Sequence, residues 1–144
     1  MMKRTMLTAA IFAAGVVAGM SMRSAAVVQA QGGTHVYEIR TYTTPDQAKL
    51  DALKARFRDH TITIFNKHNM KSIGYWVPQD APLSQNTLIY ILEHPSREAA
   101  KANWAAFGAD PEWVKAKADS EVNGRLTTKV ESVFADPTDF SPIK

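Results

Sequence analysis

One aromatic-rich segment, residues 103–113, constrains the fold of this chain more than any other. Its first two aromatic residues are spaced three apart and lie on one face of a helix, which Gly108 is expected to stop. An aspartate followed by proline is typical of a new helix start, with the aspartate as the cap. The segment therefore predicts a broken helix whose aromatic side chains belong to the core. Its defining residues are Trp104, Phe107, Asp110, Pro111 and Trp113.

The first thirty residues have the features of a secretory signal. Lys3 and Arg4 form a basic start, residues 5–22 are almost uncharged, and residues 28–30 place small side chains at a cleavage site. We expect cleavage after Ala30 and export to the periplasm or the cell exterior, with no membrane attachment afterwards. The alternative is an uncleaved anchor, because the apolar run approaches the roughly 18 to 20 residues that span a bilayer.

The charge balance of the remaining chain excludes some partners. Lys3, Arg4 and Arg23 account for the formal net charge of +3, so residues 31–144 carry equal numbers of acidic and basic side chains. This balance does not predict a nucleic-acid partner. The chain has no cysteine, which excludes disulfides and thiolate sites. Residues 31–144 have the size of a single domain, with a core over about 34–136 and a proline-containing tail over 136–144.

Periodicity divides the first half of the domain into a strand, a helix and a strand. Residues 34–43 alternate as a strand does, and Thr44-Pro45-Asp46-Gln47 resembles a capping box with Thr44 as the N-cap. Asn69 is expected to end the helix in a left-handed conformation, and residues 70–77 form the next strand. The apolar stripe of the helix is Leu50, Leu53, Phe57, Thr61 and Ile64.

The second half predicts a strand over 86–93, a helix capped by Ser96, a second helical piece from 111 to about 122, and a strand over 126–135. The order β-α-β-β-α-β is that of an α+β, ferredoxin-like fold with a four-stranded antiparallel sheet. Both helices then cover one face of the sheet. We expect the other face to pack against a second copy, which gives a homodimer.

With this topology, the chain resembles the NIPSNAP family of the dimeric α+β-barrel superfamily. The resemblance extends over residues 34–142, and it implies a homodimer whose two sheets enclose a barrel with a cavity. It implies no settled activity, although related barrels include cofactor-free monooxygenases. Asn69 stands where relatives often carry glycine. The matching segments are residues 37–42, 65–68, 73–76, 88–92, 94–97, 104–107, 110–113 and 123–124.

Charged and aromatic residues on the strands are the candidate cavity residues. Glu38, Arg40 and Tyr42 share one strand face, and Lys129 and Glu131 alternate in the same way on the last strand. If those faces belong to the uncovered side, the charges enter the dimer barrel, where they form an ion-pair network or anchor a ligand. Tyr75 and Trp76 point to opposite faces. Trp76 and His68 complete the candidate set.

The histidines do not predict a metal site. His60 and His68 lie eight residues apart on the first helix, which turns them away from each other. His60 is interpreted as a histidine at the edge of the core, and His68 as a partner of the carbonyl groups at the helix end. We therefore expect neither a metal nor another cofactor.

The sequence leads to three functional hypotheses. The first is an exported dimer that binds a small apolar or aromatic molecule in its barrel. The second is a cofactor-free oxidoreductase, similar to monooxygenase barrels, with His68, Arg40 or Trp76 near the substrate. The third is a protein-interaction module. Fold alone does not choose among them.

Overall fold

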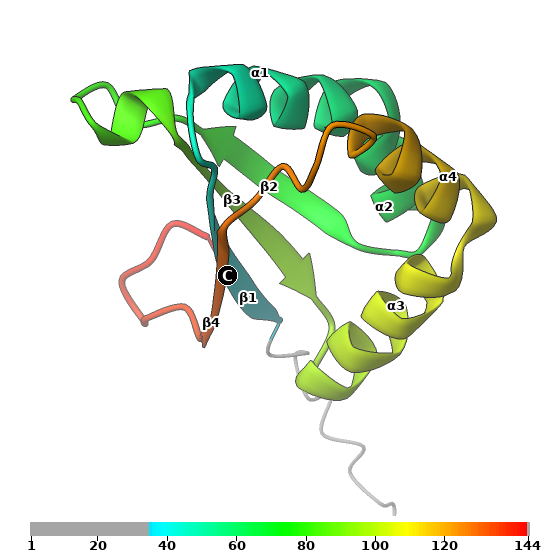
Figure 1. Ribbon diagram of the computed structural model, residues 1–144. Helices are drawn as coiled ribbons and strands as arrows, with labels where there is room; N and C mark the ends of the chain where they lie inside the picture. The colour runs from blue at the N-terminus through cyan, green and yellow to red at the C-terminus, as the bar shows by residue number, and fades with distance from the viewer. Residues whose placement is uncertain (1–34, 144) are drawn as a thin grey trace, which may run out of the picture.

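The structure is a computed structural model that describes residues 35–143. Four strands form one antiparallel sheet in the order β2-β3-β1-β4. This is the expected α+β, ferredoxin-like arrangement (Figure 1). The signal segment, residues 1–30, lies outside the described residues. The strands are β1 (Val36–Thr43), β2 (Lys71–Trp76), β3 (Thr87–His94) and β4 (Lys129–Ala135).

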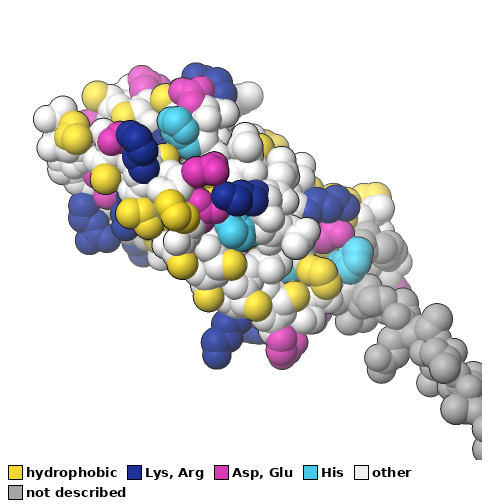
Figure 2. All heavy atoms as spheres, turned by 90° about the vertical axis from the view of Figure 1, so that its right-hand side faces the viewer, with side chains coloured by type: hydrophobic (Ala, Val, Ile, Leu, Met, Phe, Trp, Pro, Cys, Tyr) yellow, Lys and Arg dark blue, Asp and Glu magenta, His cyan; other side chains and the backbone are white. Residues whose placement is uncertain are grey.

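The helices gather on one side of this sheet, so that the opposite face stays open (Figure 1). Figure 2 looks onto the right-hand side of that view and shows charged side chains of both signs scattered over it. None of the helices within residues 35–143 has the length and hydropathy needed to span a bilayer. The helices are α1 (Gln47–Arg56), the π-helical turn η1 (Phe57–Thr61), α2 (Ile62–Lys67), the 3-10 turn η2 (Leu83–Gln85), α3 (Arg97–Ala109) and α4 (Pro111–Ser120).

The first helix begins two residues later than its capping-box pattern predicts. Asp46, not Thr44, is the N-cap, and its carboxylate accepts a hydrogen bond from the backbone N–H of Lys49 at 2.8 Å. Thr44 is buried, and its own N–H donates to the carbonyl of Asn86 at 2.8 Å. Thr44 is thus held by the segment just before β3, and Pro45 precedes the cap.

The first helix also contains a turn that periodicity does not reveal. At η1 the N–H of Ile62 donates to the carbonyl of Phe57, five residues back, which is the π-helical pattern. The hydroxyl of Thr61 donates to the carbonyl of Arg56 at 3.2 Å. The predicted stripe is nevertheless confirmed, since all five of its residues are buried. Asn69 ends the helical region with φ of 55°, as expected.

The predicted break in the second helical region is confirmed, with one difference. Asp110 ends α3 and caps α4, where its carboxylate accepts from the N–H of Glu112 at 2.8 Å, and Pro111 opens α4. Gly108 does not stop α3, which continues through Ala109. The aspartate, with its extended backbone (ψ of 124°), makes the break.

The ends of α4 and β4 also differ from the prediction. The helix ends at Ser120 instead of about residue 122, and the strand begins at Lys129 instead of 126. Leu126 precedes the strand but is almost fully buried in the core. Its apolar character reflects that burial and not strand pairing.

Aromatic side chains fill the space between the sheet and the helices. Phe65 contacts Phe107 at 4.9 Å and Trp104 at 5.6 Å between ring centroids. Phe107 in turn contacts Trp113 at 4.5 Å. Such pairs add about 0.5–1.5 kcal/mol each beyond the area they bury. The aromatic residues of segment 103–113 are therefore part of the core packing, as predicted.

Candidate functional site

The carboxylate of Glu38 lies at the centre of a buried polar cluster and is 1% exposed. One oxygen accepts hydrogen bonds from the guanidinium of Arg40 and from the hydroxyl of Ser132 at 2.6 Å. The other lies 3.0 Å from His94 Nε2 and accepts from Trp104 Nε1 at 2.6 Å. Four groups thus surround one carboxylate. We call this set, together with Tyr42 and Tyr90, the Glu38 cluster.

Arg40 links the carboxylate to two tyrosines. Its guanidinium lies 4.2 Å from the ring centroid of Trp104 and reaches the Tyr42 hydroxyl at 3.4 Å. Tyr90 donates to that same hydroxyl at 3.0 Å. A stacked guanidinium of this kind stabilises through a cation–π interaction as well as through charge. The cluster therefore joins β1, β3 and β4 to helix α3.

The ionisation of Glu38 follows from these contacts. Burial raises the pKa of the carboxyl, but hydrogen bonds from His94, Ser132, Trp104 and Arg40 outweigh it and hold the pKa at about 2. Glu38 is therefore a carboxylate at neutral pH. Because both oxygens already accept two hydrogen bonds, it is poorly placed to act as a base. We interpret the cluster as a structural ion-pair network.

The structure separates the candidate residues onto two faces of the sheet. Glu38, Arg40 and Tyr42 lie on the helix-covered face, since Trp104 of α3 contacts the first two and Phe57 packs on the third. The condition under which these three would enter a dimer barrel is therefore not met. Lys129 and Glu131 pair across the strands with Thr43 and Thr41, and these four lie on the open face.

His68 lies in the helical layer, apart from these strand residues. Its Nε2 is 2.7 Å from Asp110 Oδ2, which also accepts from Lys67 Nζ at 2.9 Å. The expected contact of the His68 ring with helix-end carbonyls is replaced by this carboxylate. Hydrogen bonds from Lys67 and His68 lower the pKa of Asp110. His68 therefore helps to hold the α3–α4 break next to the end of α2.

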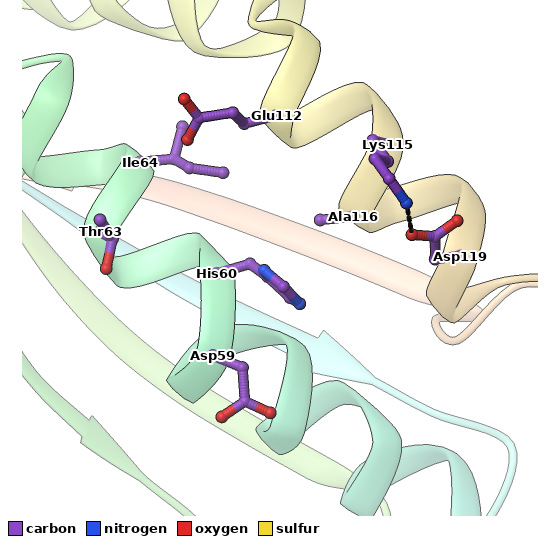
Figure 3. Close-up of a pocket in the computed structure, with 8 residues that line it drawn as sticks. All are labelled: Asp59, His60, Thr63, Ile64, Glu112, Lys115, Ala116 and Asp119. Carbon is purple, nitrogen blue, oxygen red and sulfur yellow. Dashed lines mark hydrogen bonds and ion pairs between the residues drawn. The ribbon is translucent and has the colours of Figure 1, made fainter.

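One groove lies between η1 and α4 (Figure 3). It has a volume of about 250 Å³, and His60 extends from η1 toward the side of α4. His60 is exposed, so it is not a core-edge residue. Lys115 and Asp119 pair with each other at its rim. No group of side chains within residues 35–143 has the composition of a metal site.

The open face of the sheet carries another hollow. Ile39, Ile73 and Ile91 line it together with Ile143 of the C-terminal segment, and its volume is about 180 Å³. Trp76, farther along the same face, is 48% exposed and lies against Gly74, where there is no side chain to displace it. Tyr75 points to the helix side and packs against the core. The predicted opposite orientation of the two aromatics is confirmed.

A further hollow lies between η1 and the ends of β2 and β3, and we call it the η1 pocket. Its volume is about 370 Å³, within the usual range for small-molecule sites. The wall is mostly apolar and aromatic, with two cations added from successive turns of the helix. The lining residues are Lys54, Phe57, Arg58, Ile62, Tyr75, Trp76, Val77 and Leu88.

Burial defines the chemistry of the one phenol in this wall. Burial raises the pKa of Tyr75, and the hydrogen bond between its hydroxyl and Ser72 at 2.6 Å offsets part of this shift. Tyr75 is therefore a neutral phenol at neutral pH. It also stacks on Tyr90 at 5.6 Å and contacts Phe57 edge-on at the same separation. These contacts fix the aromatic wall in place.

Apart from Trp76, the residues of the η1 pocket were not among the candidates from sequence. The apolar stripe identifies Phe57 as a core residue, which it is, but the stripe does not show that a hollow remains beside it. The spacing of Lys54 and Arg58 places them one turn apart on a helix. Their common position beside a strand end depends on tertiary packing.

Family comparison gives a specific match. The model of the NIPSNAP family matches residues 37–142. A search of curated proteins finds no match. Among solved structures, a NIPSNAP family protein of unknown function from Agrobacterium tumefaciens is 25% identical, with a TM-score of 0.67. The match covers 78% of this chain and 96% of that protein.

Two further structures extend the comparison. An uncharacterised NIPSNAP-like domain protein from Burkholderia xenovorans is 22% identical over 76% of this chain and 90% of its own, with a TM-score of 0.64. A monooxygenase from Streptomyces coelicolor, solved in complex with nanaomycin D, is 17% identical over 73% and 88%, with a TM-score of 0.53. At these identities the likeness concerns the fold.

Proposed function

The chain belongs to the NIPSNAP family, and we propose that it binds a small, flat, apolar or aromatic molecule in the η1 pocket. The observation that carries the proposal is the pocket wall itself. Phe57, Tyr75 and Leu88 present apolar and aromatic surface around about 370 Å³ of space. Sites for small molecules are mostly concave and apolar, with a few polar groups that set orientation.

This location differs from the barrel cavity that the sequence favoured. The open-face hollow is about half as large, and the C-terminal segment already contributes Pro137 and Ile143 to it. The η1 pocket is formed within a single copy of the chain. Its lining residues all come from that copy, and one of them, Trp76, is also exposed on the open face.

Binding can be tested with N-phenyl-1-naphthylamine, a neutral probe whose fluorescence increases in apolar surroundings. We expect saturable binding to the wild-type protein and its loss in Ile62→Trp, because a larger side chain at this lining position fills the pocket. Val114→Trp is the matched control, since Val114 is an exposed residue of α4. Equal binding by Ile62→Trp and the control would exclude the η1 pocket as the site.

We also propose that two copies associate through the open sheet face. Ile39, Trp76 and Val133 are exposed there to 36%, 48% and 60%, which is a cost that burial against a second copy would remove. Sedimentation velocity at micromolar concentration should show a dimer, and Val133→Lys should weaken it. A monomer at all concentrations up to 100 µM, as an order of magnitude for weak association, would contradict this.

An oxidoreductase role has less support than binding. Proton abstraction from a substrate usually needs a nearby histidine or carboxylate. The described residues that line the η1 pocket include neither type, and His68 and Arg40 are engaged elsewhere. The likeness to a monooxygenase concerns the fold and assigns no reaction to this pocket.

Export remains part of the proposal because the first thirty residues have the features of a secretory signal. Cell fractionation, followed by mass spectrometry of the mature N-terminus, tests it. We expect the mature protein in the exported fraction, beginning at Gln31. Recovery of the uncleaved chain in the membrane fraction would favour the anchor instead.

A further inference from the structure

We propose that the η1 pocket selects aromatic molecules that carry a carboxylate or another anionic group. This inference rests on the proposed function and names the ligand class. It follows from the two cations in the lining, Lys54 and Arg58. An otherwise apolar pocket with charge of only one sign favours a ligand of the opposite sign.

The two cations stand one helical turn apart and differ in whether a carboxylate of the chain compensates their charge. Like charges four residues apart repel each other across a helix surface. Lys54 has a partner, because its Nζ contacts Asp51 Oδ1 at 2.7 Å on the exposed side of the helix. Arg58 makes no ion pair with any residue within 35–143. Arg58 is therefore the free cation at the pocket.

The charge at Arg58 is suited to a planar anion. A guanidinium binds a carboxylate through two parallel hydrogen bonds, which fixes orientation as well as position. The exposed head group lies at the solvent side of a wall that contains Phe57 and Tyr75. A ligand with its ring against the aromatic wall and its carboxylate at the arginine satisfies both parts of the site.

Arg58 is the second residue of the π-helical turn η1. The π-helical turn begins at Phe57, so the aromatic wall residue and the arginine are neighbours in the same turn. Single π-helical turns within α-helices are frequent at functional sites. The buried Phe57 and the exposed Arg58 of this turn both line the η1 pocket.

The test compares two probes of the same shape, naphthalene-2-carboxylate and naphthalene-2-carboxamide. Binding is measured by the change in tryptophan fluorescence, because Trp76 borders the pocket, and independently by isothermal calorimetry. We expect the carboxylate to bind at least fivefold more tightly than the amide. The ratio should fall as salt is raised from 20 to 500 mM, on the order of the range over which surface charges are screened.

Variants assign the preference to one residue. Arg58→Gln should abolish the advantage of the carboxylate and leave the affinity for the amide unchanged. Arg58→Lys keeps the charge but not the guanidinium that forms two parallel hydrogen bonds. This variant should retain part of the advantage of the carboxylate. Arg125→Gln is the control, because Arg125 is an exposed arginine in the loop before β4 and outside the pocket lining. Circular dichroism checks that each variant is folded.

The outcomes separate the inference from the proposed function. Equal affinity for the two probes would overturn the anionic preference and leave the pocket as a binding site. The same loss in Arg125→Gln as in Arg58→Gln would also overturn it, since the effect would then reflect net charge. If neither probe binds and N-phenyl-1-naphthylamine also fails, both proposals are wrong.

Discussion

Replacement of Glu38 by glutamine tests the most completely buried charge in the described chain. The substitution keeps the shape of the side chain and removes its charge, which leaves Arg40 without its counter-ion. The pKa of Glu38 falls from 4.5 to about 2 in the folded protein. This difference corresponds to about 3 kcal/mol of stability at neutral pH.

The sign of the pH dependence follows from the lowered pKa. The stabilisation is complete above the unfolded value of 4.5 and is lost as the pH falls toward about 2, where the folded carboxylate takes up a proton. The free energy of unfolding of Glu38→Gln should therefore lie about 3 kcal/mol below wild type at pH 7. The gap should shrink to about half of that at pH 3.

Urea unfolding, followed by circular dichroism at pH 7, 4 and 3, measures this gap. Glu131→Gln serves as the control, because Glu131 is exposed and its ion pair with Lys129 lies on the surface. That pair should contribute less than about 1 kcal/mol. A gap that is below 1 kcal/mol at pH 7, or that stays the same at pH 3, would refute the assignment of the Glu38 cluster as a stabilising ion-pair network.

Three further substitutions test the core and the helix break. Gly74→Ala places a Cβ 2.7 Å from the Trp76 ring, so the indole should swing outward and its fluorescence should shift to longer wavelength and become more quenchable by acrylamide; an unchanged spectrum would contradict this. Asp110→Ala removes a helix cap and the carboxylate that Lys67 and His68 contact, so it should cost at least about 0.5–2 kcal/mol in thermal or urea unfolding, and no loss would refute the capping role. Trp104→Phe keeps a ring but loses the donor to Glu38, and should cost about 1.5–3 kcal/mol; a neutral effect would show that water replaces the indole N–H.

The fold was predictable because alternation and helical periodicity are local. The stripe from Leu50 to Ile64 and the cap at Asp110 lie where those patterns place them. The N-cap of the first helix was not predictable, since Thr44 and Asp46 are both residue types that cap helices. Only the contact of Thr44 with the carbonyl of Asn86, a residue far along the chain, decides between them.

The site was less predictable because it depends on contacts between residues far apart in the chain. Alternation shows that Glu38, Arg40 and Tyr42 share a face, but not which face the helices cover. Both faces of β1 carry aromatic and β-branched residues, so the pattern itself is balanced. The π-helical turn is equally hidden, because the spacing of four between Phe57 and Thr61 fits an ordinary helix.

The outer strands of the sheet have a consequence for solution behaviour. β2 and β4 each have one unpaired edge, and such edges invite further strands and fibre growth. β4 carries the exposed charges of Lys129 and Glu131, and β2 begins with the exposed Lys71. Charged side chains at strand edges oppose the addition of another chain. Concentrated solutions of this protein should therefore stay clear and should not form aggregates that bind thioflavin dyes.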